Sequence, residues 1–113
     1  KIVNRDVDKA NELKKRINAI NKHLKISVFP KSEYSISNCD IIINATSLGL
    51  KQNDEVPFDV TKSSSNCIIA DIIMQPEETE LLRQSKLIGR SIHYGKNMIE
   101  SQIDLVGDFL NLW

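Results

Sequence analysis

The fold of this chain is decided by one stretch of sequence, Asp40-Ile41-Ile42-Ile43-Asn44-Ala45-Thr46-Ser47-Leu48-Gly49-Leu50. A short apolar run ends here in small polar residues and a glycine. Such a run is typical of a strand that is buried on both faces, as in a parallel sheet covered by helices. The polar residues then follow the carboxyl end of the strand, where open α/β sheets bind their ligands. The alternative interpretation is a buried strand followed by an ordinary loop.

Strands and helices alternate along the rest of the chain. Short apolar runs predict strands over residues 1–4, 26–29, 40–44, 67–71 and 91–94. Apolar residues at helical spacing predict helices that begin near Asp6 or Asp8, at Pro76 and at Lys96. This alternation indicates an α/β fold with a mostly parallel sheet and helices on both faces. We expect residues 1–113 to form one domain with a C-terminal helix over residues 96–112.

The charges of the chain balance, with 15 Lys and Arg against 15 Asp and Glu in 113 residues. A neutral balance argues against a nucleic-acid surface, and no apolar run reaches the roughly 18 residues that a membrane span needs. We therefore expect no nucleic acid and no membrane as partners, and a cytoplasmic location. Cys39 and Cys67 each adjoin an apolar run, which favours buried thiols over a disulfide or a metal site.

Asn4 and Arg5 follow the first predicted strand. If this is the second strand of a dinucleotide-binding fold, its end is where such folds meet the adenosine ribose. An arginine there suits a 2′-phosphate, because its planar guanidinium donates two parallel hydrogen bonds. The alternative is an exposed arginine at a strand end.

Four segments together carry a family resemblance. They are Asn4-Arg5, the stretch Asn44–Leu50, the stretch Asp71–Pro76 with Thr79, Leu81 and Leu82, and Gly95 with Met98 and Gln102. In order and spacing they resemble the Asn-Arg-Thr, Asn-Ala-Thr-Ser-x-Gly-Met, Asp-x-x-Tyr-x-Pro-x-x-Thr-x-Leu-Leu and Gly-x-x-Met-Leu-x-x-Gln motifs of the shikimate and quinate dehydrogenase family. The resemblance covers the NAD(P)-binding, Rossmann-like half of such an enzyme.

The resemblance implies a role for each matching residue. The residues that it implies for cofactor binding are Asn4 and Arg5 at the adenosine ribose, Asn44, Ala45, Thr46 and Ser47 along the cleft, and Gly95 and Met98 near the nicotinamide. Gln102 would reach a substrate hydroxyl, and Met74 would lie beside the substrate. The implied partners are NADP, with NAD or dual use open, and a small hydroxylated cyclic acid. The implied reaction is the reversible reduction of 3-dehydroshikimate to shikimate in aromatic amino acid biosynthesis.

Two residues depart from the family pattern. Asp6 replaces the threonine after Asn-Arg, and a carboxylate beside a 2′-phosphate would repel it. Met74 replaces a tyrosine, and a thioether donates no hydrogen bond. A shifted substrate preference follows if Met74 faces the substrate, whereas packing at the strand end is the equal alternative.

Two features of the family are expected outside this sequence. The glycine-rich turn that binds the pyrophosphate would precede Lys1, and the catalytic lysine and aspartate would lie in the amino-terminal domain. The first, central strand of the sheet would then be missing, so the strands at 1–4 and 40–44 lack their shared neighbour. We expect those strands to pair directly, another chain to fill the gap as in a homodimer, or the missing part of the protein to fill it. The fragment alone is predicted to be inactive.

Two other functions remain open from the sequence. One is another Rossmann oxidoreductase, such as a glutamyl-tRNA reductase-like domain, which shares the Ala-Thr-Ser turn. The other is a non-catalytic module that binds a partner or senses a nucleotide. Gln102 and the Pro76-to-Thr79 pattern argue against the first of these alternatives.

Overall fold

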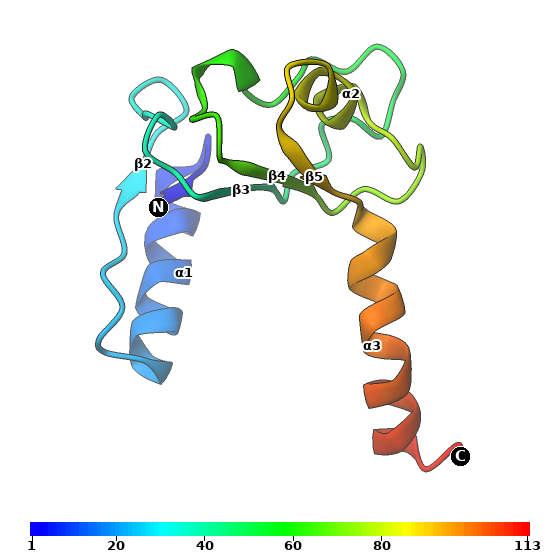
Figure 1. Ribbon diagram of the computed structural model, residues 1–113. Helices are drawn as coiled ribbons and strands as arrows, with labels where there is room; N and C mark the ends of the chain where they lie inside the picture. The colour runs from blue at the N-terminus through cyan, green and yellow to red at the C-terminus, as the bar shows by residue number, and fades with distance from the viewer. The chain divides into compact units, whose positions relative to one another are not determined.

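The computed structural model describes residues 1–113 as two compact units, residues 1–35 and 36–113. Parallel strands alternate with helices along both units (Figure 1). In chain order the elements are β1 (Ile2–Val3), α1 (Val7–Ile20), β2 (Val28–Phe29), β3 (Ile41–Asn44), the 3₁₀ helix η1 (Val60–Lys62), β4 (Ile68–Asp71), α2 (Glu80–Leu87), β5 (Ser91–His93) and α3 (Gly95–Leu110). The predicted α/β fold is confirmed.

The first unit is a strand–helix–strand motif. β1 pairs in parallel with β2, with Ile2 opposite Val28, and α1 packs against both strands. The helix begins where the sequence predicts, because the Asp6 side chain accepts a hydrogen bond from the Lys9 N–H at 3.1 Å. Ala10 is the buried residue of the helix and marks the face that covers the strands.

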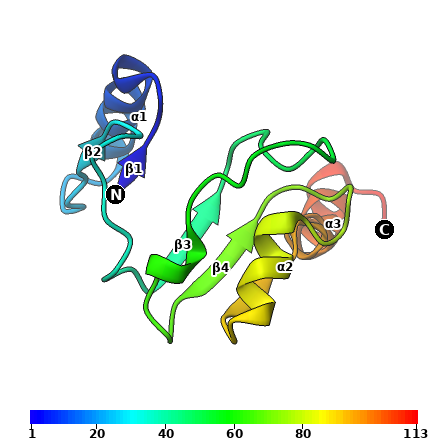
Figure 2. The ribbon, with the colours of Figure 1, turned by 90° about the horizontal axis from the view of Figure 1, so that it is seen from above.

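The second unit is a three-stranded parallel sheet with the order β3-β4-β5. Asn44 at the end of β3 lies opposite Asp71 at the end of β4, so both strands finish at the same edge. Figure 2 shows β3 and β4 side by side, with α2 next to β4. α2 packs against β4 and β5 and returns the chain from the end of one strand to the start of the next, as a right-handed parallel connection requires.

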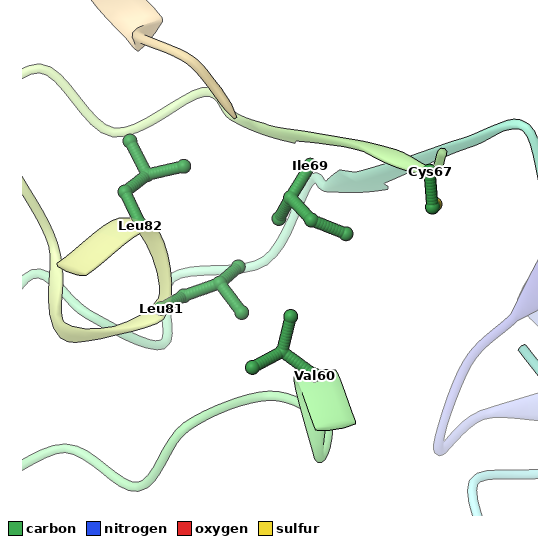
Figure 3. Packing of buried hydrophobic residues seen from close by; sticks show 5 residues of the cluster. All are labelled: Val60, Cys67, Ile69, Leu81 and Leu82. Atoms are coloured by element: carbon green, nitrogen blue, oxygen red, sulfur yellow. The ribbon is translucent and has the colours of Figure 1, made fainter. Parts of the chain in front are cut away.

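The hydrophobic core of this unit lies between the sheet, α2 and η1. Figure 3 shows its five fully buried side chains, which are Val60, Cys67, Ile69, Leu81 and Leu82. Burial of a side chain such as Ile69 or Leu82 contributes about 1.5–3 kcal/mol each relative to exposure. The predicted buried thiol is confirmed for Cys67, and both cysteines are free.

The expectation that the strand of the 40–50 stretch is buried on both faces is wrong within this chain. Ile42 packs against the core, but Ile41 and Ile43 on the opposite face are 56% and 60% exposed. The apolar run predicted burial correctly for one face. The other face is just as apolar, and α2, the helix packed against this sheet, lies on the core side.

Each unit has its own sheet: β1 forms its ladder with β2, and β3 forms its ladder with β4. The three expectations for the missing neighbour, which are direct pairing, a second chain and further polypeptide, stay predictions.

Helix boundaries differ from the sequence prediction at two places. α2 begins at Glu80 and not at Pro76, because Thr79 caps it. The Gln75–Pro76 peptide bond is cis. α2 ends as predicted before Gly89, which adopts a left-handed φ of 78°. α3 spans Gly95–Leu110 where residues 96–112 were expected. No helix combines the length and apolar character needed to span a membrane.

Candidate functional site

A cavity of about 500 Å³ lies at the carboxyl ends of β3 and β4. Two segments form it, the corner that follows β3 and the loop that follows β4. Its lining residues are Ala45, Thr46, Ser47, Leu50, Ile72, Ile73, Met74 and Gln75. This is the edge of a parallel sheet where ligands bind in open α/β folds.

The corner after β3 is shaped by the side chain of Asn44. Its amide nitrogen donates to the Leu48 carbonyl at 3.0 Å and to Asp71 Oδ1 at 3.2 Å. Its Oδ1 accepts from the Thr46 N–H at 3.1 Å and the Thr46 hydroxyl at 2.7 Å. All four hydrogen-bonding positions of the amide are therefore used inside the protein. Asn44 is 2% exposed, so it builds the corner and presents no free polar atom to a ligand.

A second turn, formed around Asp54, follows the corner in the chain and is hydrogen-bonded to its last residues. The Asp54 carboxylate accepts from the N–H groups of Gly49 and Lys51, both at 3.0 Å. These backbone bonds lower the pKa of Asp54, because they stabilise its charged form. Gly49 adopts a φ of 111°, which residues with a side chain rarely reach, and this explains the glycine of the motif.

Asp71 at the end of β4 accepts three hydrogen bonds. Oδ1 accepts from Asn44 and from the Ile73 N–H at 3.1 Å, and Oδ2 accepts from the Thr79 hydroxyl at 2.8 Å. Asp71 is 3% exposed and Thr79 1% exposed. These two residues of the Asp71–Leu82 motif therefore belong to a buried polar chain that runs from β3 through β4 to α2.

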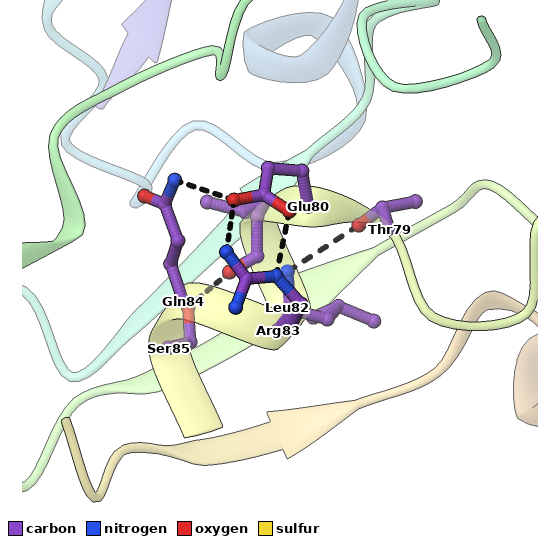
Figure 4. A network of polar contacts seen from close by, with 7 residues as sticks. Thr79, Glu80, Leu82, Arg83, Gln84 and Ser85 are labelled. Atoms are coloured by element: carbon purple, nitrogen blue, oxygen red, sulfur yellow. Dashed lines mark hydrogen bonds and ion pairs between the residues drawn. The ribbon is translucent and has the colours of Figure 1, made fainter. Parts of the chain in front are cut away.

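Thr79 also begins α2, where a surface network surrounds the first turn (Figure 4). Its Oγ1 accepts from the Leu82 N–H at 3.4 Å, as an N-cap residue does. On the exposed side, Glu80 accepts from both Arg83 Nε and Nη2, at 2.7 and 2.6 Å, and from Gln84 at 2.8 Å. Hydrogen bonds from Arg83, then from Gln84, lower the pKa of Glu80 to about 2.

The start of α3 is attached to the loop after β4. Gly95 is buried, and a Cβ on it would lie 2.7 Å from the Ile72 carbonyl oxygen. Next to it, Lys96 pairs with Glu77, and the Tyr94 hydroxyl donates to Glu78 at 3.0 Å. The beginning of α3 is thus fixed against one wall of the cavity.

Four of the predicted site residues meet in the cavity. Ala45, Thr46, Ser47 and Met74 line it together. Met74 is 42% exposed, which leaves its thioether accessible at the cavity wall. Ile73 also lines the cavity and is 4% exposed, so it contributes to packing at the strand end. The predicted contact of Met74 with a substrate stays a prediction.

Met98 and Gln102 are exposed on α3 and do not line the cavity. Helical spacing puts them on the same face as Gly95. At about 1.5 Å per residue, Gln102 lies about 10 Å along the helix from Gly95. Their predicted contacts with nicotinamide and substrate stay predictions.

Asn4 and Arg5 lie in the other unit, between β1 and α1. The Asn4 side chain accepts from the Asp6 N–H at 2.9 Å, and Asp6 caps the helix. Arg5 is exposed. The structure therefore gives Asn4 a local role in the turn and leaves the Arg5 guanidinium accessible at the end of β1.

The buried residues that hold the cavity walls in place were not identified from the sequence. Asp71 and Thr79 were matched to a motif without a role, and both are buried: Asp71 accepts from the Asn44 side chain, and Thr79 donates to Asp71. The available signal was a carboxylate directly after the apolar residues Ile68-Ile69-Ala70, where an unpaired buried charge would be costly. No group of three or more His, Cys, Asp or Glu side chains is placed to hold a metal ion.

The chain is similar to known dehydrogenases over most of its length, although no family model matches it. It is 30% identical over 102 residues to the shikimate dehydrogenase (NADP(+)) of Staphylococcus haemolyticus, which covers 90% of this chain and 38% of that protein. It is 36% identical over 105 residues to the shikimate dehydrogenase (NADP(+)) of Methanosphaera stadtmanae, covering 89% of this chain and 37% of that protein. The chain thus spans little more than a third of these relatives.

Solved structures of several dehydrogenases and a reductase share the fold. A shikimate dehydrogenase in complex with NADP+ superimposes with a TM-score of 0.78 at 29% identity, over 87% of this chain and 36% of that one. The quinate dehydrogenase of Corynebacterium glutamicum in complex with NAD also gives 0.78, at 24% identity over 86% and 35% of the two chains, which shows the fold alone. The ligand-free 5-ketofructose reductase of a Gluconobacter strain gives 0.69 at 30% identity, over 87% and 36%. The predicted resemblance of this chain to the shikimate and quinate dehydrogenase family is therefore confirmed.

Proposed function

We propose that this chain is the cofactor-binding part of an NADP-dependent shikimate or quinate dehydrogenase. The observation that carries the proposal is the cavity at the ends of β3 and β4, whose lining combines Ala45, Thr46 and Ser47 with Met74. The reaction of the whole enzyme would be the reversible reduction of 3-dehydroshikimate to shikimate. Further polypeptide, amounting to about the remaining length of the relatives, would supply the substrate domain and the pyrophosphate-binding turn.

The cavity fits a nicotinamide ring by its chemistry. Ile72, Ile73 and Met74 offer an apolar surface for one face of a flat ring, and the small side chains of Ala45 and Ser47 allow close approach of the backbone. When bound, the nicotinamide supplies the hydride chemistry. The chain's own residues would position the ring, with Gly95 and Met98 nearby at the start of α3.

The adenosine end of the cofactor would meet Asn4 and Arg5. The exposed guanidinium at the end of β1 would bind a 2′-phosphate by parallel hydrogen bonds. NADP is therefore the proposed cofactor, as in the similar shikimate dehydrogenases (NADP(+)). Asp6 leaves NAD or dual use open, because its carboxylate adjoins the same place.

The substrate would be a small hydroxylated cyclic acid, with Gln102 donating to one of its hydroxyls. Met74 is the observation that favours a shifted preference within this class, because a thioether at the cavity wall donates no hydrogen bond where the family has a phenol. No catalytic residue is assigned in this chain. Residues 1–113 alone are therefore proposed to bind weakly and not to turn over substrate.

The test is an assay of the complete polypeptide encoded with this chain. The purified polypeptide is incubated with shikimate or quinate and with NADP+ or NAD+. Reduction of the cofactor is followed by the absorbance of the reduced nicotinamide. We expect reduction of NADP+ with shikimate or quinate, and none by residues 1–113 alone. Equal turnover by residues 1–113 alone would contradict the proposal that further polypeptide supplies the substrate domain. If the complete polypeptide bound neither dinucleotide, the proposed cofactor-binding role would be contradicted. Binding of dinucleotide without turnover of either acid would favour the non-catalytic, nucleotide-sensing alternative.

A further inference from the structure

One buried carboxylate joins the two walls of the cavity. The backbone ladder between β3 and β4 ends with the bond from the Ile72 N–H to the Asn44 carbonyl at 3.2 Å. Beyond that point Asp71 Oδ1 continues the connection. It accepts from the Asn44 side chain, which holds the Thr46 wall, and from the Ile73 N–H, which belongs to the other wall.

The two oxygens of Asp71 have separate partners. Oδ1 binds the two cavity walls, whereas Oδ2 binds only the Thr79 hydroxyl at the beginning of α2. Thr79 does not line the cavity. A substitution at Thr79 therefore removes the helix cap but leaves the Oδ1 bonds between the two cavity walls in place. The effect of lower protein stability can thus be measured apart from the effect of altered cavity geometry.

We propose that Asp71 is a positioning residue for the ligand of this cavity. It sets the separation and orientation of the Ala45–Ser47 corner relative to Ile73 and Met74. At 3% exposed it does not itself reach a ligand, so it acts through Asn44 and through the backbone of Ile73. The identity of the ligand rests on the function proposed above, but the link between the walls does not.

Three substitutions distinguish this role from a general structural one. Asp71→Leu keeps the branched shape and removes both acceptor oxygens. Asp71→Asn keeps one acceptor oxygen, which is weaker because it is neutral. Thr79→Val is the matched control, because it removes the Oδ2 partner and the cap while Oδ1 keeps both walls.

Two measurements on the complete polypeptide give the readout. Hydrogen–deuterium exchange followed by mass spectrometry reports the opening of segments 45–50 and 72–75, and titration with NADP+ gives its dissociation constant. For Asp71→Leu we expect faster exchange in both segments and at least tenfold weaker NADP+ binding, since buried hydrogen bonds to a charged group are lost. For Asp71→Asn we expect about threefold weaker binding, a partial rescue. For Thr79→Val we expect lower thermal stability with NADP+ affinity within about twofold of the parent.

The proposal is overturned if Asp71→Leu leaves exchange in either segment unchanged, or if Thr79→Val weakens NADP+ binding as much as Asp71→Leu does. If Asp71→Leu fails to fold, Asn44→Ala provides the test, because the Asn44 side chain reaches segment 72–75 through Asp71. Exchange must then rise at Ile73, and unchanged exchange there overturns the proposal. If the parent binds no NADP+, the cofactor assignment fails. The exchange data still decide on Asp71.

Discussion

Gly95 lies so close to Ile72 that a Cβ on residue 95 would be 2.7 Å from the Ile72 carbonyl oxygen. This contact joins the first residue of α3 to the loop that forms one wall of the cavity. The Ile72 carbonyl belongs to the backbone, which moves less readily than a flexible side chain. Residue 95 must therefore be glycine for reasons of space, not of conformation.

Gly95→Ala is expected to destabilise the protein by about 1–3 kcal/mol, because an atom is forced into a packed site. Urea denaturation measures the loss. Gly89→Ala is the control, since nothing lies within 4 Å of a Cβ there and only its left-handed φ of 78° resists the change, at about 1 kcal/mol. A Gly95→Ala variant as stable as the parent would show that α3 does not begin against Ile72.

Glu80 should contribute to stability in a limited range of pH. Hydrogen bonds from Arg83 lower its pKa in the folded state to about 2, from 4.5. Because the folded value is the lower one, the contribution is present above about pH 4.5 and is lost as the pH falls towards 2. We expect the melting temperature of the parent to exceed that of Glu80→Gln slightly at pH 7, and the difference to vanish near pH 2. The effect is small because the pair is exposed to solvent. A difference that stays constant from pH 7 to pH 2 would exclude this contribution.

The two thiols should react at different rates with a water-soluble disulfide reagent. Burial raises the pKa of Cys67, which is 0% exposed, so its reactive thiolate is scarce at pH 8. Cys39 is only partly buried. We expect one thiol to react in the folded protein and two in denaturant, and Cys39→Ala to abolish the fast reaction. Rapid reaction of Cys67 in the folded Cys39→Ala variant, or of both thiols in the folded parent, would contradict the placement of Cys67 in the core.

The preference between NADP+ and NAD+ should depend on the residue after Arg5. The Asp6 carboxylate caps α1 and adjoins the proposed place of the 2′-phosphate, which it repels. Asp6→Thr keeps a side chain that can cap the helix and removes the charge. We expect the ratio of NADP+ to NAD+ affinity of the complete polypeptide to rise roughly tenfold, or about 1.4 kcal/mol.

Arg5→Gln is the matched control for this prediction. It should lower NADP+ affinity and leave NAD+ affinity almost unchanged, because only the 2′-phosphate needs the guanidinium. An equal loss of affinity for both dinucleotides would mean that Arg5 does not meet the 2′-phosphate, and the basis for an NADP preference would be lost.

Local patterns were sufficient to predict the order of strands and helices. The cap at Asp6 and the left-handed Gly89 follow from chemistry within a few residues, and both are observed. Pro76 misled the prediction of α2 because a proline is common at a helix start, whereas the cap three residues later, Thr79, gains a second bond from its hydroxyl to Asp71. That bond spans eight residues, and no local pattern contains it.

The candidate site was predicted only in part, because some of its contacts join residues that are distant in sequence. Ala45, Thr46 and Ser47 are consecutive, so one corner carries them together. The parallel register ends β3 and β4 at the same edge, where the loop after β4 adds Met74 to the cavity lining. The hydrogen bonding of Asn44 could not be predicted in full from local sequence, because one of its four side-chain bonds goes to Asp71 of the next strand. Burial was overestimated at Ile41 and Ile43, since an apolar run shows which residues can be covered and not what covers them.

A crystal structure of the complete polypeptide with NADP+ would show where the nicotinamide binds. We expect the ring in the cavity between the Ala45–Ser47 corner and Met74, with Asn44 still bonded to Asp71. A nicotinamide bound elsewhere, or a cavity closed by other parts of the polypeptide, would contradict this expectation.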